Sequence, residues 1–110
     1  MPLPLEIDCQ SVKAQLDAGG DFFLLDCREP DEYQAAKIEG ATLVPMSELP
    51  ARLRELDFHK QGQVVVHCHH GGRSLRVARW LREQGFPDAQ SMAGGIDQWS
   101  LEIDSSVPRY

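Results

Sequence analysis

The sequence lacks the features that direct a chain into a membrane or into the secretory pathway. It contains no run of about 18 apolar residues, which a membrane-spanning helix requires. Its first residues, Met-Pro-Leu-Pro-Leu-Glu, have neither the charged n-region nor the apolar h-region of a signal peptide. We therefore expect a cytoplasmic protein with no membrane contact.

Cysteine is scarce in this chain, and acidic residues outnumber basic ones. The three cysteines, Cys9, Cys27 and Cys68, form an odd set that does not resemble a disulfide framework. A free cysteine of a cytosolic protein is usually a small buried hydrophobic residue, so a functional role must be argued from its neighbours. The net charge of −6 argues against nucleic acid as a partner, although it permits a local positive pocket.

The length and the apolar content are those of one small domain. With 110 residues, 42% of them hydrophobic, the chain is long enough for one core and too short for two. We expect a single domain over residues 1–110, with its core over about residues 7–104.

Short apolar runs alternate with helical patterns along the chain. Residues 22–25 and 64–66 suit strands that are buried on both faces, and residues 41–44 form a shorter candidate. Helices are expected at residues 9–18 after an Asp8 cap, 30–36, from a Ser47 cap to residue 56, 75–81 and after Gly94–Gly95. This alternation predicts an α/β fold with a central parallel sheet flanked by helices on both faces. The tail from residue 105 is expected to be irregular.

The stretch richest in chemistry follows the clearest strand, which runs into Cys68. Gly71, Gly72, Arg73 and Ser74 then lead into a helix. Glycines let backbone N–H groups converge on one centre, and the helix N-terminus adds partial positive charge. A cysteine in such a place has a pKa of about 3.5–7.5 instead of about 8.5, so its thiolate is a nucleophile at neutral pH. We expect Cys68 to carry the chemistry, with Arg73 as a nearby cation and Ser74 as a helix cap or a donor to the anion.

Two other interpretations of this stretch compete with a reactive loop. In one, Cys68 is merely buried in a turn that happens to contain glycines. In the other, His67, His69 and His70 bind a metal together with Cys68. Adjacent side chains of a tight loop diverge, and His59 is isolated and supplies no second ligand pair, so no metal is expected. His69 and His70 are expected to line the pocket mouth and tune its charge, or to be simply exposed.

Several motifs resemble those of single-domain rhodaneses, which belong to the rhodanese-like sulfurtransferases. Residues 24–33, Leu-Leu-Asp-Cys-Arg-Glu-Pro-Asp-Glu-Tyr, resemble the family's first signature, and residues 37–41 continue it with Lys37 where the family usually has His. Residues 68–74, Cys-His-His-Gly-Gly-Arg-Ser, match the active-site loop at its Cys, Gly, Arg and Ser positions. Residues 94–99, Gly-Gly-Ile-Asp-Gln-Trp, match the closing signature. The resemblance covers nearly the whole chain.

The resemblance implies the rhodanese fold and a ping-pong transfer of sulfur that needs no cofactor. Cys68 would attack the outer sulfur of a donor and become a persulfide, from which a nucleophilic acceptor removes the sulfur. The loop that holds the anion would consist of His69, His70, Gly71, Gly72, Arg73 and Ser74. Its N–H groups would bind the outer sulfur much as an oxyanion hole binds oxygen. The sequence leaves open whether thiosulfate, polysulfide, glutathione persulfide, cyanide or a sulfur-carrying protein takes part.

One departure from the family concerns His69. The family's thiosulfate enzymes often carry Arg directly after the Cys, so a titratable side chain with an ordinary pKa near 6.5 replaces a permanent cation. We expect weaker use of thiosulfate, which is a dianion, and a stronger pH dependence below neutrality.

Three further candidate residues lie at the carboxyl end of the first apolar strand. Asp26 and Arg28 either form part of the rim of the site, or pair with each other and fix the local turn. Cys27 either resolves the persulfide as a disulfide or packs in the core. Trp80 and Trp99 are expected to be core residues.

Two other functions remain compatible with this fold. A thiol phosphatase or arsenate reductase has five residues between its Cys and Arg, whereas four separate Cys68 from Arg73. The shorter loop makes a smaller cradle that suits one sulfur atom. The non-enzymatic alternative is a redox-sensing or partner-binding rhodanese module, although inactive versions commonly lack the Cys. The oligomeric state does not follow from the sequence.

Overall fold

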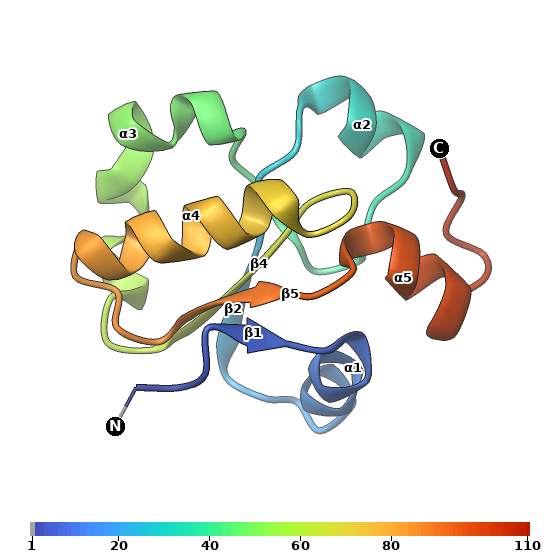
Figure 1. The fold of residues 1–110 in the computed structure, drawn as a ribbon, viewed down its shortest axis with the longest axis horizontal. Helices are drawn as coiled ribbons and strands as arrows, with labels where there is room; N and C mark the ends of the chain where they lie inside the picture. The colour runs from blue at the N-terminus through green and yellow to red at the C-terminus, as the bar shows by residue number, and fades with distance from the viewer. Residues whose placement is uncertain (1) are drawn as a thin grey trace.

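The computed structural model describes residues 2–110, and a five-stranded sheet forms its centre. The strand order is β1-β5-β4-β2-β3, and every pair of neighbours is parallel (Figure 1). The strands are β1 (Glu6–Ile7), β2 (Phe22–Asp26), β3 (Thr42–Leu43), β4 (Gln63–His67) and β5 (Ala89–Met92). The helices are α1 (Cys9–Asp17), α2 (Pro30–Ala35), α3 (Leu49–Arg52), α4 (Gly72–Glu83) and α5 (Gly95–Glu102), with 3₁₀ helices η1 (Met46–Glu48) and η2 (Leu53–His59). The predicted α/β class with a parallel sheet is confirmed.

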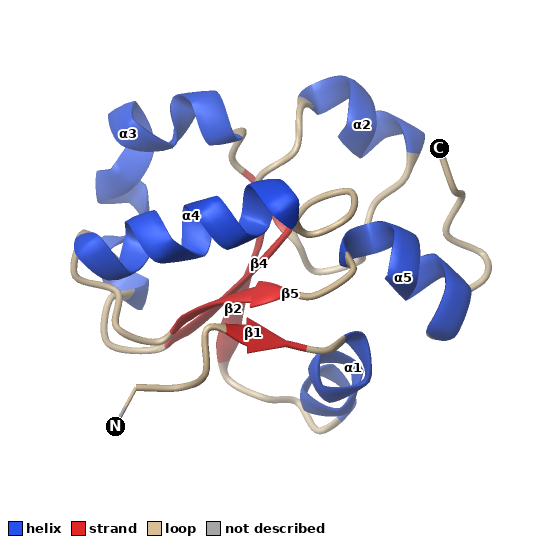
Figure 2. Cartoon of the chain, viewed as in Figure 1, coloured by secondary structure: helices blue, strands red, loops and turns tan. Residues whose placement is uncertain are grey.

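The sheet is buried on both faces because its central strands are apolar throughout. Val64 and Val66 pack on the face covered by α3 and α4, whereas Val65 packs on the face covered by α1 and α5. Figure 2 shows the strands between these two layers of helices. Trp99 is a core residue, as predicted, and Trp80 is partly buried against the core. None of the helices within residues 2–110 combines the length and the apolar content that crossing a bilayer requires.

Local signals at the helix starts act as the sequence predicts. The Asp8 carboxylate accepts a hydrogen bond of 2.7 Å from the N–H of Ser11, which caps α1. Pro30 begins α2, and the side chain of Glu32 accepts the backbone N–H of Glu29 in a capping box. This capping places Glu32 on the first turn of α2, beside the loop that follows β4.

The prediction of one helix capped by Ser47 is wrong. Residues 46–48 form the 3₁₀ turn η1, and α3 starts at Leu49 without a side-chain cap. Pro50 lies in the first turn of α3, where its fixed φ favours a new helix start. Leu49 and Leu56 are nevertheless buried, so the spacing of apolar residues correctly indicated which side chains pack in the core.

Strand β5 was not predicted from the sequence. Its central residues, Gln90 and Ser91, are polar and therefore break the apolar run that marks a buried strand. Both are nearly inaccessible, and both are paired: Gln90 accepts a hydrogen bond from Gln63, and Ser91 lies 2.7 Å from the hydroxyl of Ser74. The strand thus brings a buried hydroxyl next to the loop after β4.

Candidate functional site

The Cys68 sulfur lies at the carboxyl end of the central strand β4, within the loop that leads to α4. It accepts hydrogen bonds from the backbone N–H groups of Gly71, at 3.1 Å, and Ser74, at 3.3 Å. The hydroxyl of Ser74 is 3.4 Å away. The residue is only 1% exposed, so these groups of the protein, and not solvent, contact its sulfur. The glycine loop and the helix start therefore do converge on this cysteine.

The loop is held in this shape by the start of α5. The carbonyl oxygens of Cys68 and His69 accept hydrogen bonds of 2.9 and 3.1 Å from the N–H groups of Ile96 and Asp97. Gly95 permits this approach, since a Cβ there would collide with the carbonyl of His69. In a trans peptide the N–H points opposite to the carbonyl. The peptides that turn their carbonyls toward α5 therefore turn their N–H groups away from it.

Several N–H groups of the loop are free to bind an anion. Within residues 2–110, no protein acceptor is found for the N–H groups of His69, His70, Gly72 and Arg73. Gly71 has a φ of +110°, a left-handed conformation that glycine adopts without strain. A turn of this kind beside a helix N-terminus makes an anion-binding nest.

The surroundings of Cys68 favour its thiolate. The neighbouring thiol of Cys27 has the largest effect, and hydrogen bonds from Ser74 and Gly71 add to it. Together they outweigh burial and lower the pKa of Cys68 to about 4. The proximity of Cys68, together with burial, raises the pKa of Cys27. Burial raises the pKa of Cys9 to about 11, so Cys68 is the cysteine that ionises.

A pair of serines supports the anionic sulfur from the side of α4 and β5. Ser74 has one hydroxyl proton, which an anionic Cys68 draws toward itself. The hydroxyl of Ser91, 2.7 Å from that of Ser74, then donates to Ser74 in turn. Ser91 was not identified from the sequence, because nothing in the local pattern marks β5 as a neighbour of the loop.

Arg73 was expected to supply a cation near Cys68, and its guanidinium is paired with Glu32. It donates hydrogen bonds of 2.7 and 2.8 Å to the two carboxylate oxygens of Glu32. This contact lowers the pKa of Glu32 to about 2 and raises that of Arg73. The charge of Arg73 near the loop is therefore offset by a permanent anion. Glu32 belongs to the first sequence signature, yet no role was assigned to it.

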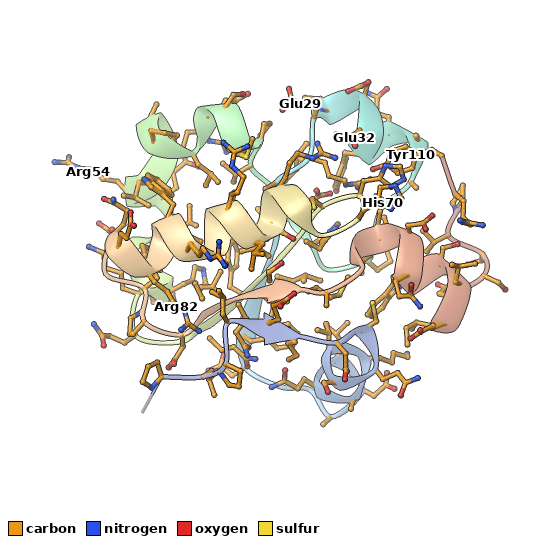
Figure 3. The ribbon with its side chains drawn as sticks, viewed as in Figure 1. Glu29, Glu32, Arg54, His70, Arg82 and Tyr110 are labelled. Atoms are coloured by element: carbon orange, nitrogen blue, oxygen red, sulfur yellow. The ribbon has the colours of Figure 1, made fainter. Side chains whose placement is uncertain are left out.

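The two loop histidines lie in an aromatic stack with Tyr110. The ring of His69 lies between those of His70 and Tyr110, with centroid distances of 3.9 and 4.0 Å. The Tyr110 hydroxyl donates a hydrogen bond of 2.8 Å to Glu32, and Figure 3 shows Glu32, Tyr110 and His70 gathered at this edge. Burial lowers the pKa of His69, whereas the side chain of His70 is 67% exposed. Tyr110 was not predicted from the sequence, because it belongs to the irregular tail.

Asp26 and Arg28 are fully buried and pair with each other, so neither is exposed at a rim. Arg28 donates from Nε and Nη2 to both oxygens of Asp26, at 2.9 and 2.7 Å, and from Nη2 to the carbonyl of Ala36. Its Nη1 donates to the hydroxyl of Tyr110 at 3.0 Å. The pair thus anchors the segment that carries Tyr110. Of the two alternatives from the sequence, mutual pairing is the one observed.

The site is a narrow loop rather than a large cavity. A surface cavity of about 640 Å³ is bordered by α1, α2 and the segment around Val107, and Cys68 does not line it. Among residues 2–110, no three His, Cys, Asp or Glu side chains are grouped to hold a metal ion. The loop alone offers a place for a small anionic atom beside the Cys68 sulfur.

Comparison with known proteins finds one family over most of the chain. The sequence model of the rhodanese-like domain family matches residues 8–102. A sulfurtransferase of Allochromatium vinosum is 34% identical over 95 residues, which cover 86% of this chain and 87% of that protein. A thiosulfate sulfurtransferase of Pseudoalteromonas translucida is 33% identical, with coverage of 81% and 83%.

Other relatives are longer, and solved structures share the fold. The chain spans 30% of a chloroplastic rhodanese-like/PpiC domain-containing protein of Arabidopsis thaliana, which is 35% identical over 89 residues covering 79% of this chain. It spans 24–50% of further relatives, among them a putative sulfur carrier protein of Bacillus subtilis at 50%. The human single-domain sulfurtransferase superposes with a TM-score of 0.79 at 25% identity, covering 91% of this chain and 98% of that one. The chain belongs to the family of rhodanese-like domains.

Proposed function

We propose that this protein is a sulfurtransferase that carries a sulfane sulfur on Cys68. The observation that carries the proposal is the pair of backbone N–H groups, at 3.1 and 3.3 Å, directed at a sulfur whose pKa is lowered to about 4. Such a thiolate is nucleophilic at neutral pH. The relatives named sulfurtransferases in Allochromatium vinosum and Pseudoalteromonas translucida support the same reaction class.

The reaction proceeds in two displacements. In the first, the Cys68 thiolate attacks the outer sulfur of a donor, an S–S bond forms, and the donor leaves with the electron pair of its own S–S bond. In the second, a nucleophilic acceptor attacks the outer sulfur of the persulfide, and the Cys68 thiolate is the leaving group. A low pKa suits Cys68 to both roles, because a thiolate of low pKa leaves readily. The free N–H groups of the loop hold the negative outer sulfur between the two steps.

The charges at the mouth favour persulfide or polysulfide donors over thiosulfate. The charge of Arg73 is offset by Glu32, and the pKa of His69 is lowered, so that side chain is neutral at pH 7. A dianionic donor therefore meets no unpaired cation on these two residues. Donors with a single negative charge lose less binding energy from the lack of a free cation. The acceptors include thiols, cyanide and a sulfur-carrying protein. The three free cysteines suit a reducing compartment such as the cytoplasm.

The test is sulfur transfer from a panel of donors, namely thiosulfate, polysulfide and glutathione persulfide, by the wild-type protein and by Cys68→Ser. Immediately after loading, the wild type should carry the mass of one sulfur atom, about 32 Da, on Cys68. The variant should lose transfer by at least about 1,000-fold, as expected for removal of a nucleophile. Cys9→Ser is the matched control, because Cys9 lies on the opposite face of the sheet and should leave transfer unchanged.

Two results would overturn the proposal. One is undiminished transfer by Cys68→Ser. The other is turnover of an aryl phosphate by a wild-type protein that takes up no sulfur, which would favour a phosphatase.

A further inference from the structure

The two strands β2 and β4 bring a second cysteine next to Cys68. Asp26 is paired with His67 in the parallel register, and the next N–H, that of Cys27, bonds to the carbonyl of His67 at 3.1 Å. Cys27 and Cys68 therefore follow paired positions on neighbouring strands, and both belong to the core on the α4 face. Neighbouring strands lie about 4.8 Å apart, within the range of Cα separations that disulfides span.

The contacts of the two sulfurs differ in direction. The Cys27 thiol donates a hydrogen bond of 3.5 Å to the carbonyl oxygen of His67, the residue before Cys68, and so lies beside Cys68 on the side of β2. The N–H groups of Gly71 and Ser74 reach the Cys68 sulfur from the loop and α4. An outer sulfur held by the loop would leave Cys68 on the side away from β2. Nucleophile and leaving group on opposite sides of a sulfur are the arrangement that thiol–disulfide exchange requires.

We propose that Cys27 is a second reactive thiol, which attacks the Cys68 persulfide and releases its outer sulfur as hydrogen sulfide. The inference rests on the proposed function, since the persulfide must form first. The bond between Cys68 and the outer sulfur breaks, and its electron pair goes to the outer sulfur. A bond forms between the sulfurs of Cys27 and Cys68, and the Cys27 proton leaves with the sulfide. The sulfane sulfur is reduced to sulfide, and the two cysteines are oxidised to a disulfide.

The state of Cys68 decides when this step occurs. In the resting protein the adjacent thiolate and burial keep Cys27 protonated, so it serves as a hydrogen-bond donor. Loading of sulfur moves the negative charge from the Cys68 sulfur to the outer sulfur, one atom further from Cys27. The repulsion that opposes ionisation of Cys27 therefore weakens once the persulfide has formed.

The consequence is a second activity of the same site. When an acceptor is present, it removes the outer sulfur and the cysteines stay reduced. When no acceptor arrives, the loaded protein releases sulfide and closes as a disulfide, which an external dithiol reductant reopens. With such a reductant the protein becomes a reductase for sulfane sulfur.

The experiment follows single loading of the protein without an acceptor. Wild type, Cys27→Ser, Cys27→Val and the control Cys9→Ser are reduced, loaded with polysulfide, desalted and followed by intact mass and by a sulfide assay. Wild type and Cys9→Ser should release one sulfide per chain and become lighter than the reduced chain by two hydrogen atoms. Peptide mapping should join Cys27 to Cys68. Both Cys27 variants should keep the added sulfur, and circular dichroism checks that they are folded.

The failures are distinguishable. A wild-type protein that loads and keeps its sulfur overturns the role of Cys27 and leaves the proposed function intact. Sulfide release that continues in both Cys27 variants overturns it as well. If no chain gains sulfur at any donor concentration, the proposed function fails, and this inference fails with it.

Discussion

The strands β2 and β4 lie side by side in register, and each runs directly into a cysteine at its carboxyl end. Cys27 and Cys68 are almost equally inaccessible, with exposed fractions of 0% and 1%. Yet the pKa of Cys68 is lowered and that of Cys27 is raised, in each case chiefly through the influence of the other cysteine. Burial acts in the same direction on both thiols, so it does not explain which one ionises.

The residues that follow each cysteine explain the difference. After Cys68, two backbone N–H groups and the hydroxyl of Ser74 are directed at its sulfur. After Cys27, Arg28 turns back to Asp26, and its guanidinium is occupied by that carboxylate and by backbone carbonyls. The end of β2 therefore holds the fold together, whereas the end of β4 presents a reactive atom. Equivalent positions at the carboxyl ends of two neighbouring strands therefore have different roles, one structural and one reactive.

The largest effect should come from breaking the structural end of β2. Arg28→Ala leaves the carboxylate of Asp26 buried without its partner, which should lower the free energy of unfolding by about 3–5 kcal/mol. Urea unfolding measures this loss. Arg54→Ala is the matched control: Arg54 is exposed and projects from the far side of the molecule (Figure 3), and its change should stay within about 0.5 kcal/mol. A loss below about 1 kcal/mol in Arg28→Ala would contradict the structural role of this pair.

A smaller effect should follow from freeing Arg73, the cation at the reactive end of β4. Glu32→Gln removes the carboxylate that offsets Arg73, so kcat/KM for thiosulfate should rise about 2–5-fold, the effect of a partly exposed charge worth about 0.5–1 kcal/mol. The kcat/KM for a singly charged persulfide donor should rise less. Because the pKa of Glu32 is lowered to about 2, the Glu32–Arg73 pair is intact at neutral pH. The ratio of kcat/KM between variant and wild type should therefore not vary between about pH 6 and pH 8.

Glu29→Gln is the control for that comparison. It removes the same charge from the same helix start, but the carboxylate that Arg73 bonds to is that of Glu32. Figure 3 shows Glu29 further from Tyr110 and His70 than Glu32 is. An equal rise for both donors, or an equal rise in the Glu29 variant, would show that the Arg73 pair does not select the donor.

The smallest effect concerns the histidine after Cys68. Burial lowers the pKa of His69, so it becomes a cation only as the pH falls below about 6.5. His69→Arg adds a permanent cation, and the KM for thiosulfate should fall about 2–3-fold at pH 8. The difference from wild type should narrow as the pH falls and His69 gains its own proton. His70→Arg places the same charge on an exposed side chain and should change the KM for thiosulfate less. An unchanged KM and pH profile in His69→Arg would remove the support for this idea.

Local patterns were sufficient to predict the central part of the molecule. Residues 64–66 are β-branched and apolar, the glycines after Cys68 mark a tight turn, and Asp8 has the side chain of a helix cap. Each of these signals acts between residues that are close in the sequence. The fold class, the parallel sheet and the loop around Cys68 therefore follow from the amino-acid sequence alone.

The rest depends on contacts between distant residues. Tyr110 bonds to Glu32 across 78 residues, and Ser91 reaches Ser74 from a strand whose polar residues hide it in the sequence. The neutralisation of Arg73 by Glu32 spans 41 residues and changes the charge of the site. Pairings of this kind carry no local signal, because each side chain on its own has the pattern of a solvated surface residue.

The most direct test of the account is the ionisation of Cys68 itself. The ultraviolet absorbance of the thiolate is titrated from about pH 3 to pH 10, and the curve of Cys68→Ser is subtracted from that of the wild type. The account predicts a single thiolate with a midpoint far below neutrality, near the pKa of about 4 that the hydrogen bonds produce. A midpoint at or above the ordinary value of about 8.5 would contradict it, since the loop would then not hold an anionic sulfur.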